Sequence, residues 1–369
     1  MSAGSPRLVV VGGGILGTMH AVEGVRRGYE VVQLDRDAQP RGASVRNFGL
    51  VWVSGRAEGA ELDLALRARE RWEEVALVAP GAGFRPAGSL TLARSPGEVA
   101  VLEEAASRPD AGLRGLELLT AGEARALVPA VRGEVLAALH CRRDALVEPR
   151  AVLGALRDAL DASGAYRFLP GLHAVEPEPH AVRDHRGALH EGDLVVCCPG
   201  ASPGGFAADH LAAAPLRRVR LQMLETEPFS GEVATAIADG DSLRYYPAFA
   251  GPARDALAPQ EPVAARWRAQ LLLVQRRSGH LTVGDTHAYD EPFPFDVADE
   301  PARHLGEVAS RLLGGALPPV ERRWSGVYAE VTDGGLYHRA ELAPGVVVVT
   351  GAGGRGMTLA PAIAEETFA

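Results

Sequence analysis

The chain has 369 residues, of which 47% are hydrophobic and 23% charged, as expected for a soluble globular protein of about two domains. Its net charge of −9 argues against a nucleic-acid surface, and no apolar stretch of about 18 residues predicts a membrane helix. The start, MSAGSPRL, lacks the charged and apolar blocks of a secretion signal, so we expect a cytoplasmic location.

All 38 basic residues are arginine, and the chain contains no lysine. Schiff-base enzymes that use pyridoxal phosphate and P-loop phosphotransferases need a lysine amine, so both classes are excluded. Any anionic substrate group must be held by arginine or by neutral donors. Neither a disulfide framework nor a metal site is predicted, because the three cysteines are odd in number and the histidines lack metal-ligand spacing; the residues are Cys141, Cys197, Cys198, His280, His287 and His338.

Residues 7 to 35 form the strongest motif. The apolar run from Arg7 to Val11 predicts a strand buried on both faces, and it leads into G-x-G-x-x-G and then a helical stretch. A second apolar strand, Tyr29 to Leu34, ends at an acid placed to hydrogen-bond ribose hydroxyls. We therefore expect a dinucleotide whose phosphates lie on the helix N-terminus. The contacts predicted in this unit are Gly12, Gly14, Ile15, Leu16, Gly17, Asp35 and Arg36.

The middle of the chain alternates helices and short strands. Residues 41 to 47 are polar and turn-rich, and residues 59 to 80 predict an amphipathic helix. The next expected elements are a strand over Gly88 to Ala93, helices over Glu98 to Ala106 and Ala121 to Leu127, strands over Leu136 to His140 and Ala145 to Val147, and a helix containing Val152 to Leu160.

The second half contains more strands than helices. A buried strand in GDLVVCCPGAS ends near Gly200, and further strands are expected over Pro215 to Thr226, Leu243 to Ala248, Leu271 to Val274 and Leu281 to Val283. Residues 251 to 270 predict a proline-rich surface loop, and Pro301 to Leu313 a helix. Strand, glycine-rich turn and helix then recur over Gly345 to Thr350 and GAGGRGMTLAPAIAEE, which predicts a second helix N-terminus near the cofactor.

GASVRNFG, GDLVVCCPGAS and the closing GAGGRGMTLAP resemble FAD-dependent oxidoreductases of the D-amino-acid oxidase and glycine oxidase superfamily. The resemblance implies an α/β fold: a Rossmann-like FAD-binding domain (1–85, 140–215 and 320–369) with a second α+β substrate domain built on an antiparallel sheet (86–139 and 216–319). It implies non-covalent FAD, since no cysteine or histidine stands where relatives tether the cofactor. Further FAD contacts implied are Ser44, Arg46, Asn47, Val175, Gly200, Gly351, Gly354, Arg355, Gly356, Met357 and Thr358.

The resemblance also implies oxidation of a small amine: hydride leaves the carbon beside the nitrogen, water hydrolyses the imine, and dioxygen is reduced to hydrogen peroxide. Two departures bear on the substrate. Tyr328 replaces the carboxylate-binding arginine of W-x-G-L-R-P, and Arg355 brings a cation to the closing turn. S-V-R-N-F-G with G-G-R-G-M-T-L-A-P is similar to a branch linked to phosphonate breakdown, which implies an aminophosphonate related to 2-aminoethylphosphonate. The expected substrate or catalytic residues are Asn47, Phe48, Tyr245, Tyr246, Tyr328 and Arg355.

Four alternatives stay open from the residues. The substrate could be a glycine- or sarcosine-like amino acid or an N-methyl amine, or the chain could be a flavin-binding module without oxidase activity. Arg355 could instead pair with a carboxylate or with the flavin, and Tyr245 and Tyr246 could be core aromatics. An NAD-dependent dehydrogenase is disfavoured, because the C-terminal glycine turn has no role in a single-nucleotide Rossmann protein.

Overall fold

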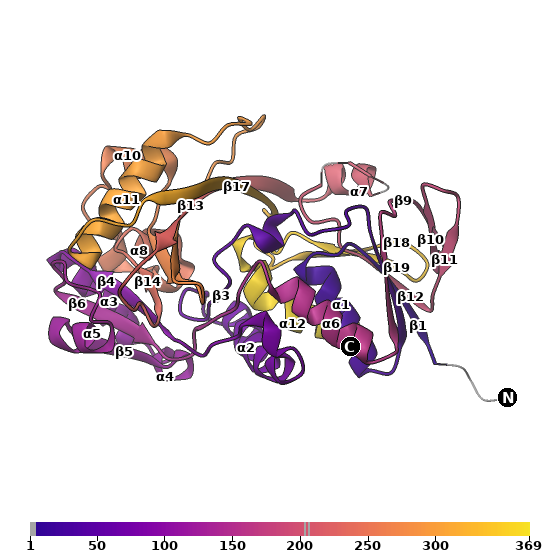
Figure 1. The fold of residues 1–369 in the computed structure, drawn as a ribbon, viewed down its shortest axis with the longest axis horizontal. Helices are drawn as coiled ribbons and strands as arrows, with labels where there is room; N and C mark the ends of the chain where they lie inside the picture. The colour runs from indigo at the N-terminus through magenta and orange to yellow at the C-terminus, as the bar shows by residue number, and fades with distance from the viewer. Residues whose placement is uncertain (1–4, 203, 206) are drawn as a thin grey trace.

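The computed structural model describes residues 5–202, 204–205 and 207–369, so the first four residues of MSAGSPRL lie outside it. Two lobes lie side by side (Figure 1). The six-stranded sheet of the first has the order β18 (His338–Ala343), β19 (Val346–Thr350), β12 (Leu194–Cys197), β1 (Arg7–Val11), β2 (Glu30–Asp35), β8 (Tyr166–Pro170). The eight-stranded sheet of the second has the order β17 (Val320–Val331), β13 (Leu216–Pro228), β16 (His280–Gly284), β15 (Leu272–Gln275), β14 (Ala236–Ala238), β4 (Ser89–Ala93), β6 (Ala137–Cys141), β5 (Leu116–Thr120).

Two small sheets complete the strands: β9 (Ala174–Glu178) with β10 (Ala181–Asp184) and β11 (Leu189–Glu191), and β3 (Leu50–Val51) with β7 (Ala145–Leu146). The α-helices are α1 (Ile15–Arg26), α2 (Ala60–Val78), α3 (Pro96–Ala106), α4 (Ala111–Arg114), α5 (Ala121–Leu127), α6 (Val152–Ala162), α7 (Ala208–Ala213), α8 (Ser242–Tyr245), α9 (Pro252–Asp255), α10 (Pro262–Trp267), α11 (Asp299–Leu313) and α12 (Gly356–Thr367). Short 3-10 turns are η1 (Ala43–Val45), η2 (Pro80–Ala82), η3 (Pro247–Phe249) and η4 (Gly353–Arg355).

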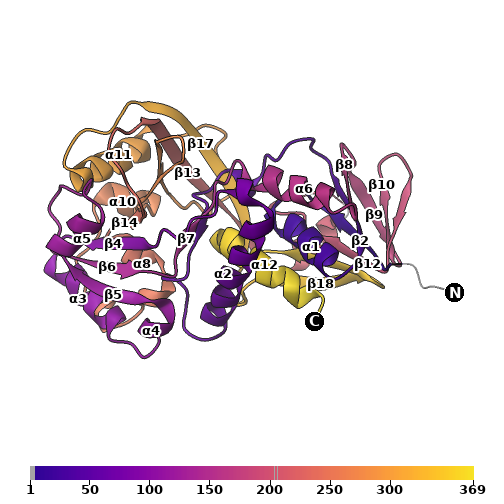
Figure 2. The same cartoon turned by 60° about the horizontal axis from the view of Figure 1, so that its bottom comes forward.

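The first lobe contains the predicted parallel sheet. β1 pairs in parallel with β2 and β12, and Leu8, Val9 and Val10 are fully buried because both faces of this sheet are covered. Only β18, at one edge, runs antiparallel. α1 and α12 lie on the same side of the sheet (Figure 2), and their apolar residues share one core with β1. The Rossmann-like part of the expected fold is confirmed.

The second lobe is organised around the eight-stranded sheet, which is antiparallel except where β14 meets β4. α11 covers one face of it, with Leu305, Val308 and Leu312 packed in one core with Leu224 and Val283 of the strands. The expected helix over residues 301 to 313 is therefore confirmed, and so is an α+β lobe on an antiparallel sheet.

Two predicted elements are wrong. The strand expected over Leu243 to Ala248 is α8 followed by η3, because Asp239 accepts the Ser242 amide at 3.3 Å and Pro247 has no N–H to give a ladder. The loop expected over residues 251 to 270 contains α9 and α10. Pro252 and Pro262 begin these helices, where the missing N–H costs nothing, so the prolines mark starts and not a loop.

Strand pairing also bears on the division between the lobes. β17 begins at Val320 and pairs along its length with β13, so residues 320–331 form part of the larger sheet, and its end also bridges from Glu330 to Ala352. β6 extends the same sheet to Cys141. The long strands β13 and β17 reach toward the smaller sheet (Figure 1), so their far ends border both lobes. In the described part of the chain, no helix combines the length and apolar character needed to cross a membrane.

The contact between α1 and α12 contains a fully buried histidine. His20 Nδ1 lies 2.7 Å from the Leu16 carbonyl oxygen, and its Nε2 lies 2.9 Å from the Thr367 hydroxyl. Burial lowers the pKa of His20 from 6.5 to about 4, because the charged imidazolium loses its hydration. The folded state thus keeps His20 neutral where the unfolded chain is protonated.

This histidine predicts a pH-dependent stability. Below about pH 6.5 the unfolded state binds a proton that the folded state does not, so stability falls toward pH 4. In urea unfolding, His20→Gln is expected to reduce the loss of unfolding free energy between pH 7 and pH 4.5 by about 2 kcal/mol relative to wild type. Substitution of the exposed His185 by Gln is the control. An equal acid sensitivity of His20→Gln and wild type would contradict the prediction.

Candidate cofactor and substrate site

The first glycine turn joins β1 to α1. Gly12 has φ +108°, and a Cβ there would lie 2.3 Å from the Cys198 carbonyl oxygen. A Cβ on Gly17 would lie 2.1 Å from the Gly12 carbonyl oxygen. The residue before α1, Gly14, has no side chain to cap the helix, and the first turn of α1 contains no acid, so the positive end of the helix dipole faces this turn. This turn can accept only glycine at two positions, and it presents a helix N-terminus suited to phosphate.

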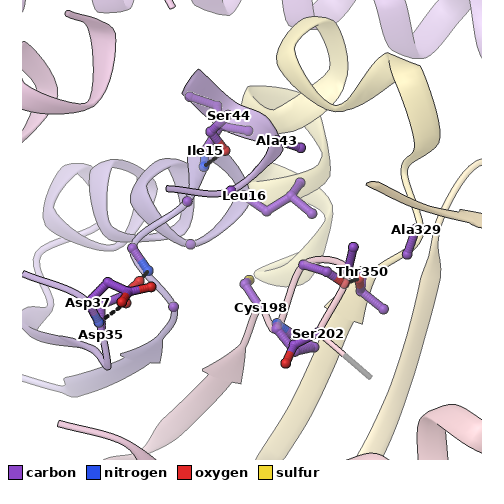
Figure 3. Close-up of a pocket in the computed structure, with 18 of the residues that line it drawn as sticks. Ile15, Leu16, Asp35, Asp37, Ala43, Ser44, Cys198, Ser202, Ala329 and Thr350 are labelled. Atoms are coloured by element: carbon purple, nitrogen blue, oxygen red, sulfur yellow. Dashed lines mark hydrogen bonds between the residues drawn. The ribbon is translucent and has the colours of Figure 1, made fainter. Parts of the chain in front are cut away.

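Asp35 ends β2 beside this turn. Its carboxylate accepts the Gly13 amide through Oδ2 and the Asp37 amide, at 2.7 Å, through Oδ1 (Figure 3). Opposite, Ser44 Oγ accepts the Ile15 amide at 2.9 Å. These bonds hold the carboxylate and the hydroxyl still at the wall of the cavity, where a carboxylate can accept from ribose hydroxyls.

The second glycine turn closes the cavity from the other side. Thr350, at the end of β19, donates its hydroxyl to the Gly200 carbonyl oxygen at 2.8 Å and so ties the two strand ends together (Figure 3). The cavity between the turns has a volume of about 530 Å³. The predicted cofactor residues that line it are Gly12, Gly14, Ile15, Leu16, Gly17, Asp35, Arg36, Ser44, Arg46, Gly200, Gly351 and Gly356.

Val175 lies elsewhere. It is on β9 with 42% of its surface exposed, and it lines neither this cavity nor the next one. Its neighbours Leu172, His173 and Ala174 line the cavity instead. The contact expected at Val175 thus stays a prediction, although the preceding residues lie nearer the cavity.

A second cavity of about 370 Å³ opens from the first, under the larger sheet. The two cavities share part of their walls, namely Ile15, Ala43, Ser44, Arg46, Tyr328, Gly353 and Gly356. Gly354, Arg355, Met357 and Thr358 line only the second. One elongated ligand can thus lie in the first cavity and extend its far end to the mouth of the second.

The second cavity brings together every expected substrate residue. Asn47, Phe48, Tyr245, Tyr246, Tyr328 and Arg355 all line it, although they come from three distant parts of the chain. Asn47, however, uses its amide internally. It donates to the Ala43 and Ser44 carbonyl oxygens at 2.8 and 3.0 Å, and it accepts the Gly49 amide at 2.6 Å. Its side chain holds the 43–49 turn in shape.

Arg355 lies near the carboxylate of Glu61, which fits the alternative that it pairs with an acid. Arg56 lies near the same carboxylate. Arg355 Nη1 lies 3.6 Å from Glu61 Oε1, and Arg56 Nη1 lies 3.3 Å from the same oxygen. Arg56 and Glu61 are both buried, and all three line the second cavity. Two guanidinium groups balanced by one carboxylate leave this wall with an excess of positive charge.

Sequence reasoning missed three further lining residues of this cavity, namely Gln270, Asp285 and His287. His287 is buried, stacks on the Tyr245 ring at 4.3 Å between ring centroids, and has Nε2 3.9 Å from Asp285 Oδ2. Burial raises the pKa of Asp285, whereas the nearby His287 acts to lower it. Asp285 directly follows β16, and a polar residue at a strand end is the one signal that could have suggested it.

Three buried polar atoms in this cavity have no hydrogen-bond partner among the described residues: Trp52 Nε1, Gln270 Oε1 and the Tyr328 hydroxyl. Burial also raises the pKa of Tyr328, so the phenol stays neutral. Unpaired buried polar groups are costly, which indicates that a polar ligand completes them. No group of metal-ligating side chains occurs in the described ranges.

These features fit a protein that binds a dinucleotide. The glycine cradle, the helix N-terminus and Asp35 fit the nucleotide half, and the unpaired atoms belong to residues that line the adjoining second cavity. A family model described as FAD dependent oxidoreductase (DAO) matches residues 7–369. The chain therefore belongs to the DAO family of FAD-dependent oxidoreductases, and FAD is its cofactor.

Solved structures share the fold. Glycine oxidase from Geobacillus kaustophilus matches with a TM-score of 0.77 at 19% identity, over 98% of this chain and 93% of the other. L-proline dehydrogenase from P. horikoshii matches with a TM-score of 0.77 at 20% identity, over 98% and 91%. Among curated relatives, one of the subunits of opine oxidase from Rhizobium meliloti is 28% identical over 239 residues. That match spans 60% of this chain and 63% of the relative, which is less than two thirds of its length.

The glycine cradle predicts a sharp effect on cofactor binding. Gly12→Ala adds a Cβ that clashes with the Cys198 carbonyl, so the purified variant is expected to bind FAD at least about 100-fold more weakly. Fluorescence quenching of added FAD by the apoprotein measures this. Gly154→Ala is the matched control, because it lies in α6 with no atom near the added Cβ and is expected to bind FAD normally. Equal FAD affinity for the two variants would refute the assigned phosphate turn.

Proposed function

We propose that the chain is an FAD-dependent amine oxidase whose substrate is a small aminophosphonate related to 2-aminoethylphosphonate. The observation that carries this proposal is the pair of guanidinium groups, Arg355 and Arg56, sharing the single carboxylate of Glu61 at the wall of the second cavity. An alkylphosphonate carries up to two negative charges and has tetrahedral oxygens, which suits two arginine forks.

The rest of the cavity supports an amine beside that anion. The Gln270 side-chain carbonyl oxygen and the Tyr328 hydroxyl are unpaired acceptors among the described residues, and a neutral amine can donate to them. Phe48, Trp52 and Tyr246 are each no more than 7% exposed and form apolar walls that exclude water. When bound, FAD supplies the acceptor for the hydride that leaves the carbon beside the amine.

Positioning is the main task of these side chains. The anion fixes one end of the substrate at Arg355, and the acceptors orient the amine, so the reacting carbon is held in one place. The amine must arrive neutral, because an ammonium group has no lone pair to assist hydride departure. Water then hydrolyses the released imine to a carbonyl compound and ammonia, and dioxygen is reduced to hydrogen peroxide.

A second candidate is an oxidase of glycine- or sarcosine-like amino acids or N-methyl amines. The same arginine pair can hold a carboxylate, and the chain has the fold of glycine oxidase and is similar to part of an opine oxidase. Tyr328 argues against it, since this phenol stands where glycine oxidase-like enzymes carry their carboxylate-binding arginine. A non-catalytic flavin module is the third candidate.

A substrate panel separates these candidates. We expect 2-aminoethylphosphonate or its N-methyl derivative to bleach the yellow holoenzyme under anaerobic conditions, with air restoring the colour and releasing peroxide. Faster bleaching by glycine or sarcosine would favour the second candidate. Failure of every amine in the panel, in a protein that binds FAD, would favour the module without activity.

The anion site predicts a change in KM. Arg355→Gln removes one charged donor, so KM for the aminophosphonate is expected to rise about 10- to 100-fold. Steady-state peroxide release measures it. Arg303→Gln, an exposed change on α11, is the control and is expected to match wild type. An unchanged KM for Arg355→Gln would place the anion elsewhere.

The neutral amine predicts a pH profile. Because only the deprotonated amine reacts, kcat/KM is expected to rise with pH, about tenfold per unit, up to the pKa of the substrate ammonium near about 10. Initial rates between pH 7 and pH 10 test this. If kcat/KM does not change between pH 7 and pH 10, the deprotonated amine is not the reacting form.

A further inference from the structure

Arg276 is a buried arginine outside both cavities. It follows β15, is 7% exposed, and donates from Nε to the Thr282 hydroxyl at 2.8 Å. Its two terminal nitrogens are buried and have no hydrogen-bond partner among the described residues. These nitrogens carry four N–H donors, and burying a guanidinium without an acceptor is strongly unfavourable.

The carboxylates nearby are already engaged. Glu225 accepts the Thr282 hydroxyl at 3.2 Å and pairs with Arg322 at 3.2 Å and Arg150 at 3.9 Å. Glu148 pairs with Arg85 at 3.8 Å and accepts a backbone amide at 3.2 Å. Neither forms an ion pair with Arg276 in the part of the chain that the structure describes.

The local charge balance is positive. The charged groups that act on Arg276 are the cations Arg85 and Arg150 and the anions Glu148 and Glu225. With Arg276 itself, three positive charges face two negative ones. Burial lowers the pKa of Arg276 to about 10, in keeping with a guanidinium that lacks a partner of its own.

Arg114 shows how this chain otherwise treats a buried guanidinium. Its Nε donates to Asp110 at 2.7 Å, and its Nη1 donates to three backbone carbonyl oxygens at 2.6 to 3.2 Å, so only one terminal nitrogen is unpaired within the described ranges. Arg276 has neither an ion pair nor a carbonyl acceptor for its terminal nitrogens. The unpaired fork is therefore a local feature of this cluster.

We propose that Arg276 is the main donor of a second anion site, which binds a small oxyanion such as phosphate or a carboxylate between the β15–β16 turn and the segments that carry Arg85 and Arg150. The fork geometry of a guanidinium matches two oxygens of either anion. Arg85 Nε is also buried without a partner among the described residues and supplies a further donor.

The site is distinct from the proposed substrate cavity. Gln270 and Leu272 line that cavity, and Arg276 lies further along the same strand and its extension, lining neither cavity. The side chains of Arg150 and Arg322 are 45% and 42% exposed, so the cluster borders solvent, while the terminal nitrogens of Arg276 are themselves buried. A bound anion would join the β15–β16 turn to the chain around Arg85, which already donates to the Gln275 carbonyl oxygen at 2.9 Å.

The test uses FAD-loaded protein in a chloride buffer, titrated calorimetrically with inorganic phosphate and, separately, with acetate. Wild type is expected to bind one equivalent that Arg276→Gln weakens at least about tenfold. Arg277→Gln is the matched control: Arg277 is exposed, and its contact with Glu148 is through the backbone. Arg355→Gln is expected to retain this binding, which separates it from any anion held in the substrate cavity.

Acetate binding without phosphate binding would identify a carboxylate as the occupant, and phosphate binding without acetate binding a tetrahedral anion; either supports the site. If Arg276→Gln does not fold, Arg150→Gln and Arg85→Gln are expected to weaken the binding at least about threefold. The proposal is overturned if neither anion binds saturably, if binding is insensitive to Arg276 and its neighbours, or if Arg355→Gln abolishes it. Those outcomes mean that water alone hydrates the guanidinium.

Discussion

In the nucleotide lobe, backbone lies close against backbone where Gly12 meets the Cys198 carbonyl and Gly17 meets the Gly12 carbonyl. No side chain fits between these segments, so β1, β12 and α1 converge on one point. Their convergence places a helix N-terminus and the Asp35 carboxylate at the same cavity. Everything else in the site is positioned relative to this contact, because the cofactor must lie along it.

The larger sheet completes the site through its longest strands. β17 carries Tyr328 to the boundary of the two cavities, where it meets Arg46 of the 43–49 turn and Gly353 of the closing turn. Three segments from distant parts of the chain thus share one wall. This arrangement joins the nucleotide cavity to the proposed substrate cavity without a gap between them.

Because the chain has no lysine, arginine is its only permanently charged basic side chain. The guanidinium group offers its N–H donors in a fixed fork. A buried guanidinium must therefore have acceptors, and the chain satisfies this in different ways. Arg114 has Asp110 and backbone carbonyls, Arg355 shares Glu61 with Arg56, and the terminal nitrogens of Arg276 have no acceptor among the described residues. The less complete the internal pairing, the stronger the reason to expect an anionic ligand.

Local sequence determined the nucleotide lobe. The apolar runs, the glycine spacing and Asp35 lie within one continuous unit, and glycine at position 17 follows from its local contact with the Gly12 carbonyl. Glycine at position 12 also depends on the distant Cys198 carbonyl. The closing glycine turn, the amphipathic helices and some residues of the cavity wall could also be predicted, because their signals are local in the sequence. Two elements were misread: Pro252 and Pro262 begin helices, and Asp239 stabilises a turn in a run that favours a strand.

Tertiary structure alone decided which side chains lie together in the second cavity. Glu61 lies far along the chain from Arg355, and Gln270, Asp285 and His287 carry no motif, so their place in the cavity depends on how distant segments of the two lobes come together (Figure 1). The sequence predicts that Asn47 binds a ligand, whereas in the structure its side-chain amide forms hydrogen bonds within the 43–49 turn. Spacing along a chain specifies local geometry, whereas which charges and hydrogen-bonding groups remain unpaired is settled only when distant segments pack together.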